Sequence, residues 1–242
     1  MPTDPFHLSL LLTGALLAGV LSAVAGFGGG VLYLPLVVAV VGARAAVPLI
    51  TFGLLFSNFT RLVILRRHIV WPLTLRYCIG AIPGAALGAF VFVHLPSTYV
   101  TKGIGGFLIV SVIFSRWQKN RPVLTRWGIF YPLGAIVGFF STILGVIGPA
   151  AMPLFLAAGL RKEAFVATVA LGAFVMHLTG TITYGQFNLL SGPLMSTGLL
   201  IGALMAIGTW VGTLILTRAT PKAFLNLVEV LLVILGVFFI FR

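Results

Sequence analysis

Residues 8–43 read LSLLLTGALLAGVLSAVAGFGGGVLYLPLVVAVVGA and contain no Asp, Glu, Lys or Arg. A helix needs about 20 apolar residues to cross a membrane, so this stretch is too long for one crossing and somewhat short for two. Residues 164–217 form a second uncharged stretch. Both are apolar on every side, unlike the alternating strands of a membrane β-barrel. The chain is therefore predicted to be an all-α polytopic membrane protein.

The composition of the whole chain agrees with a fold in lipid. Hydrophobic residues make up 60% and charged residues only 7%, whereas a soluble domain carries about 25% charged residues. The formal charge of +12 comes from Lys and Arg in short loops, where such residues set topology and contact lipid headgroups. We therefore expect no nucleic-acid binding. The lone Cys78 lies in an apolar segment, so no disulfide framework or metal motif is predicted.

The sequence repeats itself with weak similarity. GVLYLPL at residues 30–36 aligns with GPAAMPL at residues 148–154, and Gly84 and Gly88 correspond to Gly208 and Gly212. Repeats of this kind normally pack into one bundle around a shared interface. We predict a single transmembrane transporter domain over residues 1–242, with internal repeats at 8–116 and 128–241.

Six helices are predicted directly from the apolar runs: residues 45–65, 71–93, 98–115, 164–184, 189–217 and 221–241. The remaining segments, 8–42 and 128–159, are each interrupted near the middle, by Gly26–Gly30 and by Gly145–Pro149. Glycine and proline both disfavour a continuous helix. Hydropathy alone counts about eight spans, whereas two shortened helices in each interrupted segment give ten.

The positions of the positive charges favour ten segments. With ten, one face collects twelve Lys and Arg: Arg61, Arg66, Arg67, Arg76, Arg116, Lys119, Arg121, Arg126, Arg161, Lys162, Arg218 and Lys222. The other face keeps three, namely Arg44, Lys102 and Arg242. Eight crossings would divide them nine to six, a much weaker positive-inside bias. We therefore predict two inverted repeats of about five segments in the cell inner membrane, with both termini outside the cytoplasm.

In carriers with inverted repeats, interrupted helices bring backbone donors and helix ends to the substrate. On this basis Gly28, Gly29 and Gly30 are expected to line an anion site from one side, and Gly148 and Pro149 from the other. A bulky residue at Gly29 or Gly148 should then abolish binding. The alternative is close helix packing, for which small residues are common in lipid, and we favour it for Gly84, Gly88, Gly208 and Gly212.

The same residues resemble the sulfite exporter TauE/SafE family, over essentially the whole chain. The resemblance lies in Ala25–Gly30 followed by Pro35, and in a second copy, Gly145–Pro149 followed by Pro153. The second copy departs from a glycine-rich pattern at Val146 and Ile147. The family implies a secondary transporter that moves sulfite, organosulfonates or related sulfur oxyanions across the inner membrane by alternating access. It also implies that Pro35 and Pro153 belong to the binding region.

Two predicted helices each carry polar residues at helical spacing: Thr51, Asn58 and Arg61 in one, and His177, Thr181 and Tyr184 in its repeat counterpart. Asn58 and His177 occupy nearly equivalent positions, and both are candidates for binding or gating. For the threonines and Tyr184 we favour interhelical hydrogen bonds. For Arg61 we favour an anchor at the inner surface that adds long-range attraction, so that Arg61→Ala is expected to be mild.

An enzyme is not expected, because the only acids are Asp4, Glu163 and Glu229 and the four histidines are scattered. A passive anion channel and a membrane accessory protein remain alternatives to a transporter. The expected partners are a small anionic substrate and membrane lipid, without cofactor, metal or nucleic acid. A homodimer is left open by the sequence.

Overall fold

The structure, a computed structural model, describes residues 4–25, 29–118, 127–145, 154–156, 158–160 and 162–216. Every regular element in these ranges is a helix: α1 (Pro5–Ala25), α2 (Gly29–Val41), α3 (Ala43–Leu65), η1 (Arg66–His68), α4 (Trp71–His94), α5 (Ser97–Gln118), η2 (Trp127–Ile129), α6 (Phe130–Leu144), α8 (Lys162–Gln186) and α9 (Gly192–Leu216). Within the described residues, six helices are long and apolar enough to cross a membrane. The fold is that of a polytopic α-helical membrane protein, as the sequence predicts.

The helices predicted from uninterrupted apolar runs are confirmed to within a few residues. Helices α3, α4, α5 and α8 correspond to the predicted segments 45–65, 71–93, 98–115 and 164–184. Helix α9 begins at Gly192, three residues later than predicted, because the chain turns through Phe187 and Asn188, and Asn188 has a φ of 56°. The predicted helix 221–241 lies outside the described residues.

The first interrupted segment forms two antiparallel helices, α1 and α2. The Tyr33 hydroxyl donates to the Leu11 carbonyl oxygen at 2.8 Å, and a Cβ added at Gly29 would overlap the carbonyl oxygen of Ala18. Residue numbers therefore rise in α2 as they fall in α1. Helix α2 has 13 residues and is about 20 Å long, too short to cross a bilayer. The helices on the two sides of the glycine motif are thus paired, in agreement with the ten-segment interpretation.

The second interrupted segment also turns back on itself. Helix α6 ends at Leu144, and Gly145 follows with a φ of 84°, a conformation that favours glycine. After residues 146–153, which are not described, Phe155 packs against Phe130 with ring centroids 5.1 Å apart. Because Phe130 is the first residue of α6, the chain has returned to the beginning of that helix.

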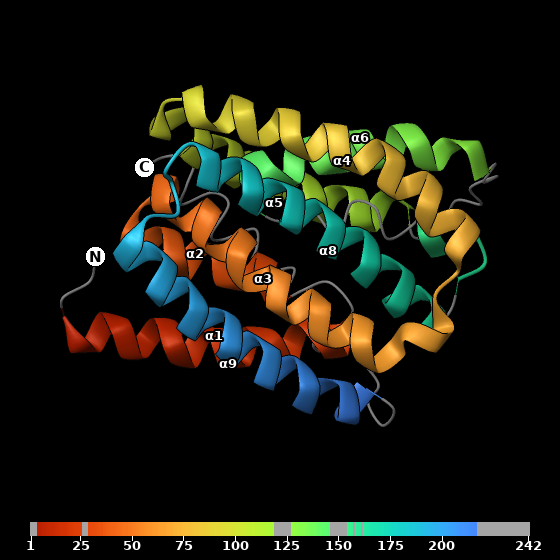
Figure 1. The fold of residues 1–242 in the computed structure, drawn as a ribbon, viewed down its shortest axis with the longest axis horizontal. Coiled ribbons are helices and arrows are strands. Elements are labelled where there is room, and N and C mark those ends of the chain that lie inside the picture. The colour runs from red at the N-terminus through yellow and green to blue at the C-terminus, as the bar shows by residue number, and fades with distance from the viewer. Residues whose placement is uncertain are drawn as a thin grey trace.

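The long helices lie in three tiers, with α4 and α6 along one edge, α3 and α8 between, and α1 and α9 along the other edge (Figure 1). Side-chain pairs fix their directions: α1, α3 and α9 run parallel, and α4, α6 and α8 run the opposite way. At the centre, α3 and α8 are antiparallel, since Phe59 contacts Phe174 and Thr51 lies near Gly180. Two inverted repeats should produce this arrangement. The repeat boundaries, 8–116 and 128–241, stay a prediction.

The two outer pairs of helices are joined by backbone contact at glycines. A Cβ at Gly84 or Gly88 of α4 would overlap the backbone of α6, at Ala135 and Phe139. A Cβ at Gly208 of α9 would likewise overlap the Leu16 carbonyl oxygen of α1. Gly212 makes the same approach at Val20. The packing role predicted for these four glycines is confirmed, and equivalent glycines serve the two halves in the same way.

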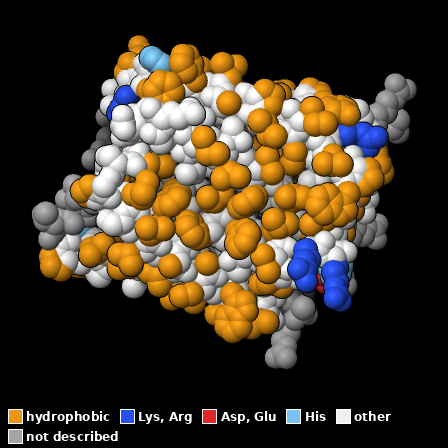
Figure 2. Space-filling view, viewed as in Figure 1, with side chains coloured by type: hydrophobic (Ala, Val, Ile, Leu, Met, Phe, Trp, Pro, Cys, Tyr) orange, Lys and Arg blue, Asp and Glu red, His pale blue; other side chains and the backbone are white. Residues whose placement is uncertain are grey.

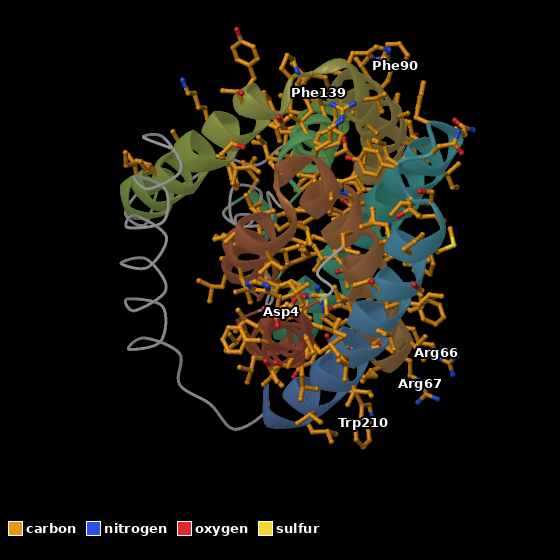
Figure 3. The ribbon with its side chains drawn as sticks, turned by 90° about the vertical axis from the view of Figure 1, so that its left-hand side faces the viewer. Asp4, Arg66, Arg67, Phe90, Phe139 and Trp210 are labelled. Carbon is orange, nitrogen blue, oxygen red and sulfur yellow. The ribbon has the colours of Figure 1, made fainter. Side chains whose placement is uncertain are left out.

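The surface separates into an apolar middle and charged ends. In Figure 2 hydrophobic side chains cover the middle of the visible face, and Lys and Arg lie toward its ends. Arg66 and Arg67 follow the end of α3 and extend outward beyond the bundle (Figure 3). Arg76 stacks on the Trp127 ring at 5.2 Å near the starts of α4 and α6. Since α3 runs opposite to α4 and α6, the end of α3 and the starts of α4 and α6 lie at the same end of the bundle. That end therefore carries all three arginines.

The charge distribution predicts the topology. In a Cys78→Ser background, Thr98→Cys should react with a membrane-impermeant maleimide in spheroplasts, and Arg67→Cys only after permeabilisation. The reason is that Arg67 lies at the end rich in arginine, which is retained in the cytoplasm. Cysteines in the 116–126 linker should behave like Arg67→Cys, and cysteines at the termini like Thr98→Cys. Labelling of Arg67→Cys from outside would contradict this orientation.

Candidate functional site

The two polar stripes meet in the centre of the bundle, along the interface between α3 and α8. Their members are buried except Thr181, whose hydroxyl oxygen alone is buried. Because α3 and α8 are antiparallel, with Phe59 against Phe174 and Thr51 near Gly180, Asn58 and Arg61 lie toward the His177 end of the α8 stripe and Thr51 toward its Tyr184 end. We call this row of Thr51, Asn58, Arg61, His177, Thr181 and Tyr184 the polar seam. The sequence predicts each stripe, but not that the stripes face each other.

Arg61 is the charged centre of the seam. Only 3% of its surface is exposed, although it lies on a helix that spans the membrane. Its Nη2 donates to Asn58 Oδ1 at 2.5 Å, and its Nη1 lies 3.4 Å from the Ser22 carbonyl oxygen near the end of α1. The expectation of a surface anchor was therefore wrong for Arg61. Helix α3 continues for another turn before Arg66 and Arg67, which take the surface position instead.

Asn58 holds Arg61 in place and has its amide group occupied. Its Nδ2 donates to the Leu54 carbonyl oxygen at 2.8 Å, and its Oδ1 accepts from Arg61. An oxyanion needs hydrogen-bond donors, whereas the Asn58 Oδ1 atom can only accept hydrogen bonds. In this conformation Asn58 therefore orients the guanidinium instead of offering a donor to an anion.

His177 and Thr181 carry the polar atoms that suggest a ligand. His177 Nδ1 and Thr181 Oγ1 are buried and have no hydrogen-bond partner among the described residues. They are four positions apart in the sequence, so they lie on the same face of α8. His177 is also close enough to Arg61 for the two side chains to interact electrostatically. Buried polar atoms almost always have hydrogen-bond partners. These two atoms could therefore form hydrogen bonds with a bound polar group.

Each end of the seam is tied to one of the interrupted segments. Arg61 approaches Ser22, which lies just before the first glycine break. Tyr184 donates its hydroxyl to the carbonyl oxygen of Thr142, which lies just before Gly145 and the second break. The residues that precede the two breaks, Ser22 and Thr142, thus contact opposite ends of one row of buried polar side chains.

A further polar contact was not predicted from the sequence. Ser57 Oγ and Thr209 Oγ1 are 2.7 Å apart and buried, and Thr209 also donates to the Gly19 carbonyl oxygen at 3.3 Å. This pair joins α3, α9 and α1. The only signal was a hydroxyl between two glycines in α9, which is common in membrane helices for packing alone.

A sequence model of the family described as "Sulfite exporter TauE/SafE" matches residues 11–239. The chain belongs to the TauE/SafE family. This is a family of membrane transporters of the sulfite-exporter type and not an enzyme family, which bears out the predicted resemblance. Comparisons with curated proteins and with solved structures gave no match.

The glycine motif of this TauE/SafE chain is described only in part. Gly28, Gly148, Pro149 and Pro153 lie outside the described residues. Gly29 packs against α1, which is the alternative that the sequence left open. Gly30 and Pro35 are buried within α2, and their place in a binding site stays a prediction.

The structure also changes the expected order of mutational effects in this family member. Replacing Gly29 with Leu would force α1 and α2 apart, because the added atoms meet the Ala18 backbone. Loss of binding in that variant would therefore not separate ligand contact from misfolding. Arg61 is buried in the seam, so its removal is now expected to be severe.

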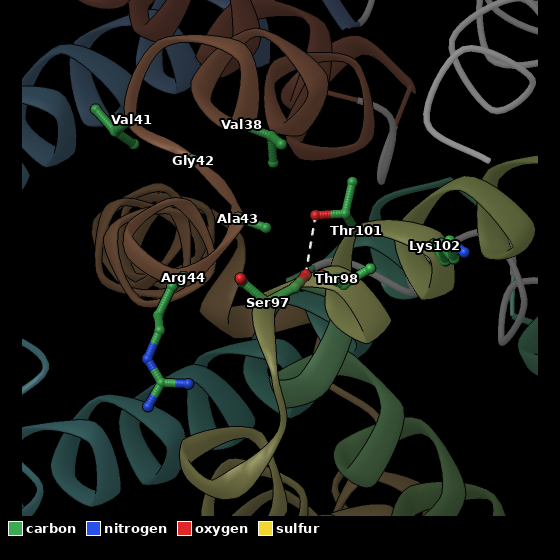
Figure 4. A pocket seen from close by; sticks show the side chains of 9 residues that line it. All are labelled: Val38, Val41, Gly42, Ala43, Arg44, Ser97, Thr98, Thr101 and Lys102. Carbon is green, nitrogen blue, oxygen red and sulfur yellow. Dashed lines mark hydrogen bonds between the residues drawn. The ribbon is translucent and has the colours of Figure 1, made fainter. Parts of the chain in front are cut away.

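In the TauE/SafE chain a pocket of about 390 Å³ lies at the opposite end of α3. It lies between the Gly42 turn and the first turns of α5, and the Thr101 hydroxyl beside it donates to the Ser97 carbonyl oxygen (Figure 4). Arg44 extends away toward α4, where it donates to the Val93 and Leu95 carbonyl oxygens. About 25 Å of helix separates Arg44 from Arg61, so this pocket is separate from the seam.

Metal chemistry has no candidate site in the part of the chain that the structure describes. No group of three or more His, Cys, Asp or Glu there could hold an ion. The polar chemistry of the seam is that of a buried guanidinium and of hydrogen-bonding side chains along the interface between α3 and α8.

Proposed function

We propose that this chain is a secondary transporter of a small sulfur oxyanion, such as sulfite or an organosulfonate, and that the anion binds at Arg61 in the polar seam. The observation that carries the proposal is a buried guanidinium in the same seam as two buried polar atoms, His177 Nδ1 and Thr181 Oγ1, that have no hydrogen-bond partner among the described residues. Charged residues inside membrane spans are costly and are retained mainly for function.

The chemistry of the seam suits an oxyanion. A guanidinium presents several N–H donors in a planar fork that matches the oxygens of a sulfonate or sulfite group. An imidazole and a hydroxyl add further donors. Asn58 keeps the guanidinium oriented, so less freedom is lost when an anion binds.

The contact between Arg61 and Ser22 suggests how binding could be coupled to movement. At 3.4 Å the Nη1 to carbonyl contact is long, whereas charge-assisted bonds to an oxyanion are about 2.7–2.9 Å. An arriving anion would therefore replace the Ser22 carbonyl as the partner of Nη1. The end of α1 would be released, and the first break could move relative to α3.

The inverted arrangement of the helices supports alternating access. The first break lies at the end of α1 and the second at the end of α6, and these helices run in opposite directions. In such folds, movement of one repeat against the other exposes a fixed site to each side in turn. Export of an anion is also favoured by the potential across the inner membrane, at about 2.3 kcal/mol per charge per 100 mV.

Flux measurements in proteoliposomes test the proposal. We expect uptake of sulfite or a small sulfonate that saturates with concentration and responds to an imposed potential. A passive channel would instead give flux without saturation over the same range, and an accessory protein would give none above empty liposomes. Either result would overturn the proposal.

A further inference from the structure

We infer that the seam selects singly charged oxyanions, such as organosulfonates and hydrogensulfite, over doubly charged ones, and that Thr181 is one of the groups that bind them. The inference rests on the proposed function and specifies its substrate class. It follows from the number of cations in the described core, and from the neutral character of the other donors.

The described core contains one strong cation. Arg61 is the buried Lys or Arg among the residues whose burial the structure describes. Other basic side chains of that part of the chain, such as Arg44, Arg66 and Lys102, lie at helix ends and are exposed. One guanidinium neutralises one negative charge.

The remaining donors at the seam carry no permanent charge. Thr181 supplies a hydroxyl, and His177 supplies an imidazole. Both have buried atoms without partners among the described residues. They lie one helical turn apart on the same face of α8, about 6 Å along the axis, so an anion bound against this face of α8 would meet both groups.

A second negative charge would be poorly compensated here. Neutral hydrogen bonds replace only part of the hydration of a doubly charged ion, and an uncompensated charge in a medium of low dielectric constant is very costly. The single charge of a sulfonate is delocalised over its oxygens and is neutralised by Arg61. For such an ion the same neutral donors are sufficient. The site should therefore distinguish two ions of similar tetrahedral shape by their charge.

Methanesulfonate and sulfate form such a pair, since neither changes its charge near neutral pH. Binding of each to the purified protein would be measured by calorimetry at pH 7.5. We expect the Kd of sulfate to be at least about a hundredfold higher than the Kd of methanesulfonate. Equal binding of both ions would overturn the inference and leave the proposed function standing. Failure to bind any sulfur oxyanion, sulfite included, would overturn both.

The role of Thr181 has a matched control on the same helix. Thr181→Val keeps the shape of the side chain and removes the hydroxyl, so methanesulfonate should bind about tenfold more weakly. Thr179→Val removes a hydroxyl that already donates to the Val175 carbonyl oxygen at 2.9 Å, and binding should not change. Normal affinity in a well-folded Thr181→Val protein would remove Thr181 from the site, as would equal losses in the two variants.

Discussion

Arg61→Ala is expected to lower anion affinity by about a hundredfold or more and to abolish transport. The substitution removes the buried cation of the seam, and truncating one partner of a buried charge-assisted contact costs about 2–5 kcal/mol. Arg61→Lys should retain partial affinity, because the ammonium keeps the charge but lacks the planar fork. Calorimetric titration with sulfite and flux into proteoliposomes measure the two effects.

Arg66→Ala is the matched control for Arg61→Ala. Arg66 lies at the end of the same helix but is exposed, so its removal should leave affinity within about twofold. Arg61→Ala also leaves Asn58 Oδ1 without its donor, which is expected to cost about 1–3 kcal/mol of stability. A monodisperse size-exclusion profile is therefore needed before binding is compared. A folded Arg61→Ala protein with unchanged affinity would show that the anion binds elsewhere.

Gly84→Ala is expected to destabilise the protein although alanine favours helix formation. The added Cβ would overlap the Ala135 carbonyl oxygen of α6, and separating two packed backbones costs about 1–3 kcal/mol. For a chain of this size the melting temperature should fall by roughly 2–12 °C. Gly84→Leu should leave little folded protein. Thermal unfolding in detergent, followed by size-exclusion chromatography, measures the change.

Gly106→Ala shows whether the loss comes from packing. Gly106 lies on α5, and a Cβ added there would meet no atom within 4 Å. The variant should be as stable as the parent protein or slightly more so, because alanine has the higher helix propensity. Gly208→Ala, at the equivalent contact with α1, should behave like Gly84→Ala. Unchanged stability in both contact variants would mean that the helices separate without cost.

The helices could be predicted because lipid imposes a simple requirement on sequence. Every backbone group must be paired inside the segment, so long uncharged runs become helices, and α3, α4, α5 and α8 match their predicted ranges closely. The relation between helices was harder to predict. Gly84 packs on α6 and Gly208 on α1 because of which helices become neighbours in the bundle. The weak repeat in the sequence indicates that the two glycines are equivalent, but not which helix each of them contacts.

The candidate site could be predicted residue by residue but not as an arrangement. Helical spacing identified Asn58, Arg61, His177 and Thr181 as polar residues within spans. Hydropathy places an arginine near a helix end at the surface, and only the contact with Ser22 of α1 reveals that Arg61 is buried. The occupied amide of Asn58 also depends on side-chain geometry that no sequence pattern carries.

The pairing of α1 with α9 has a consequence for biosynthesis. The contact between Gly19 and Thr209 joins residues 190 positions apart, so α1 leaves the ribosome long before its neighbour has been translated. Until then the face of α1 that includes Gly19 must lie against lipid or against the insertion machinery. A chain that stops after the first repeat would lack this partner, and α4 would lack α6. Each half of the protein therefore completes the other, and assembly of the bundle must wait until α9 has been translated.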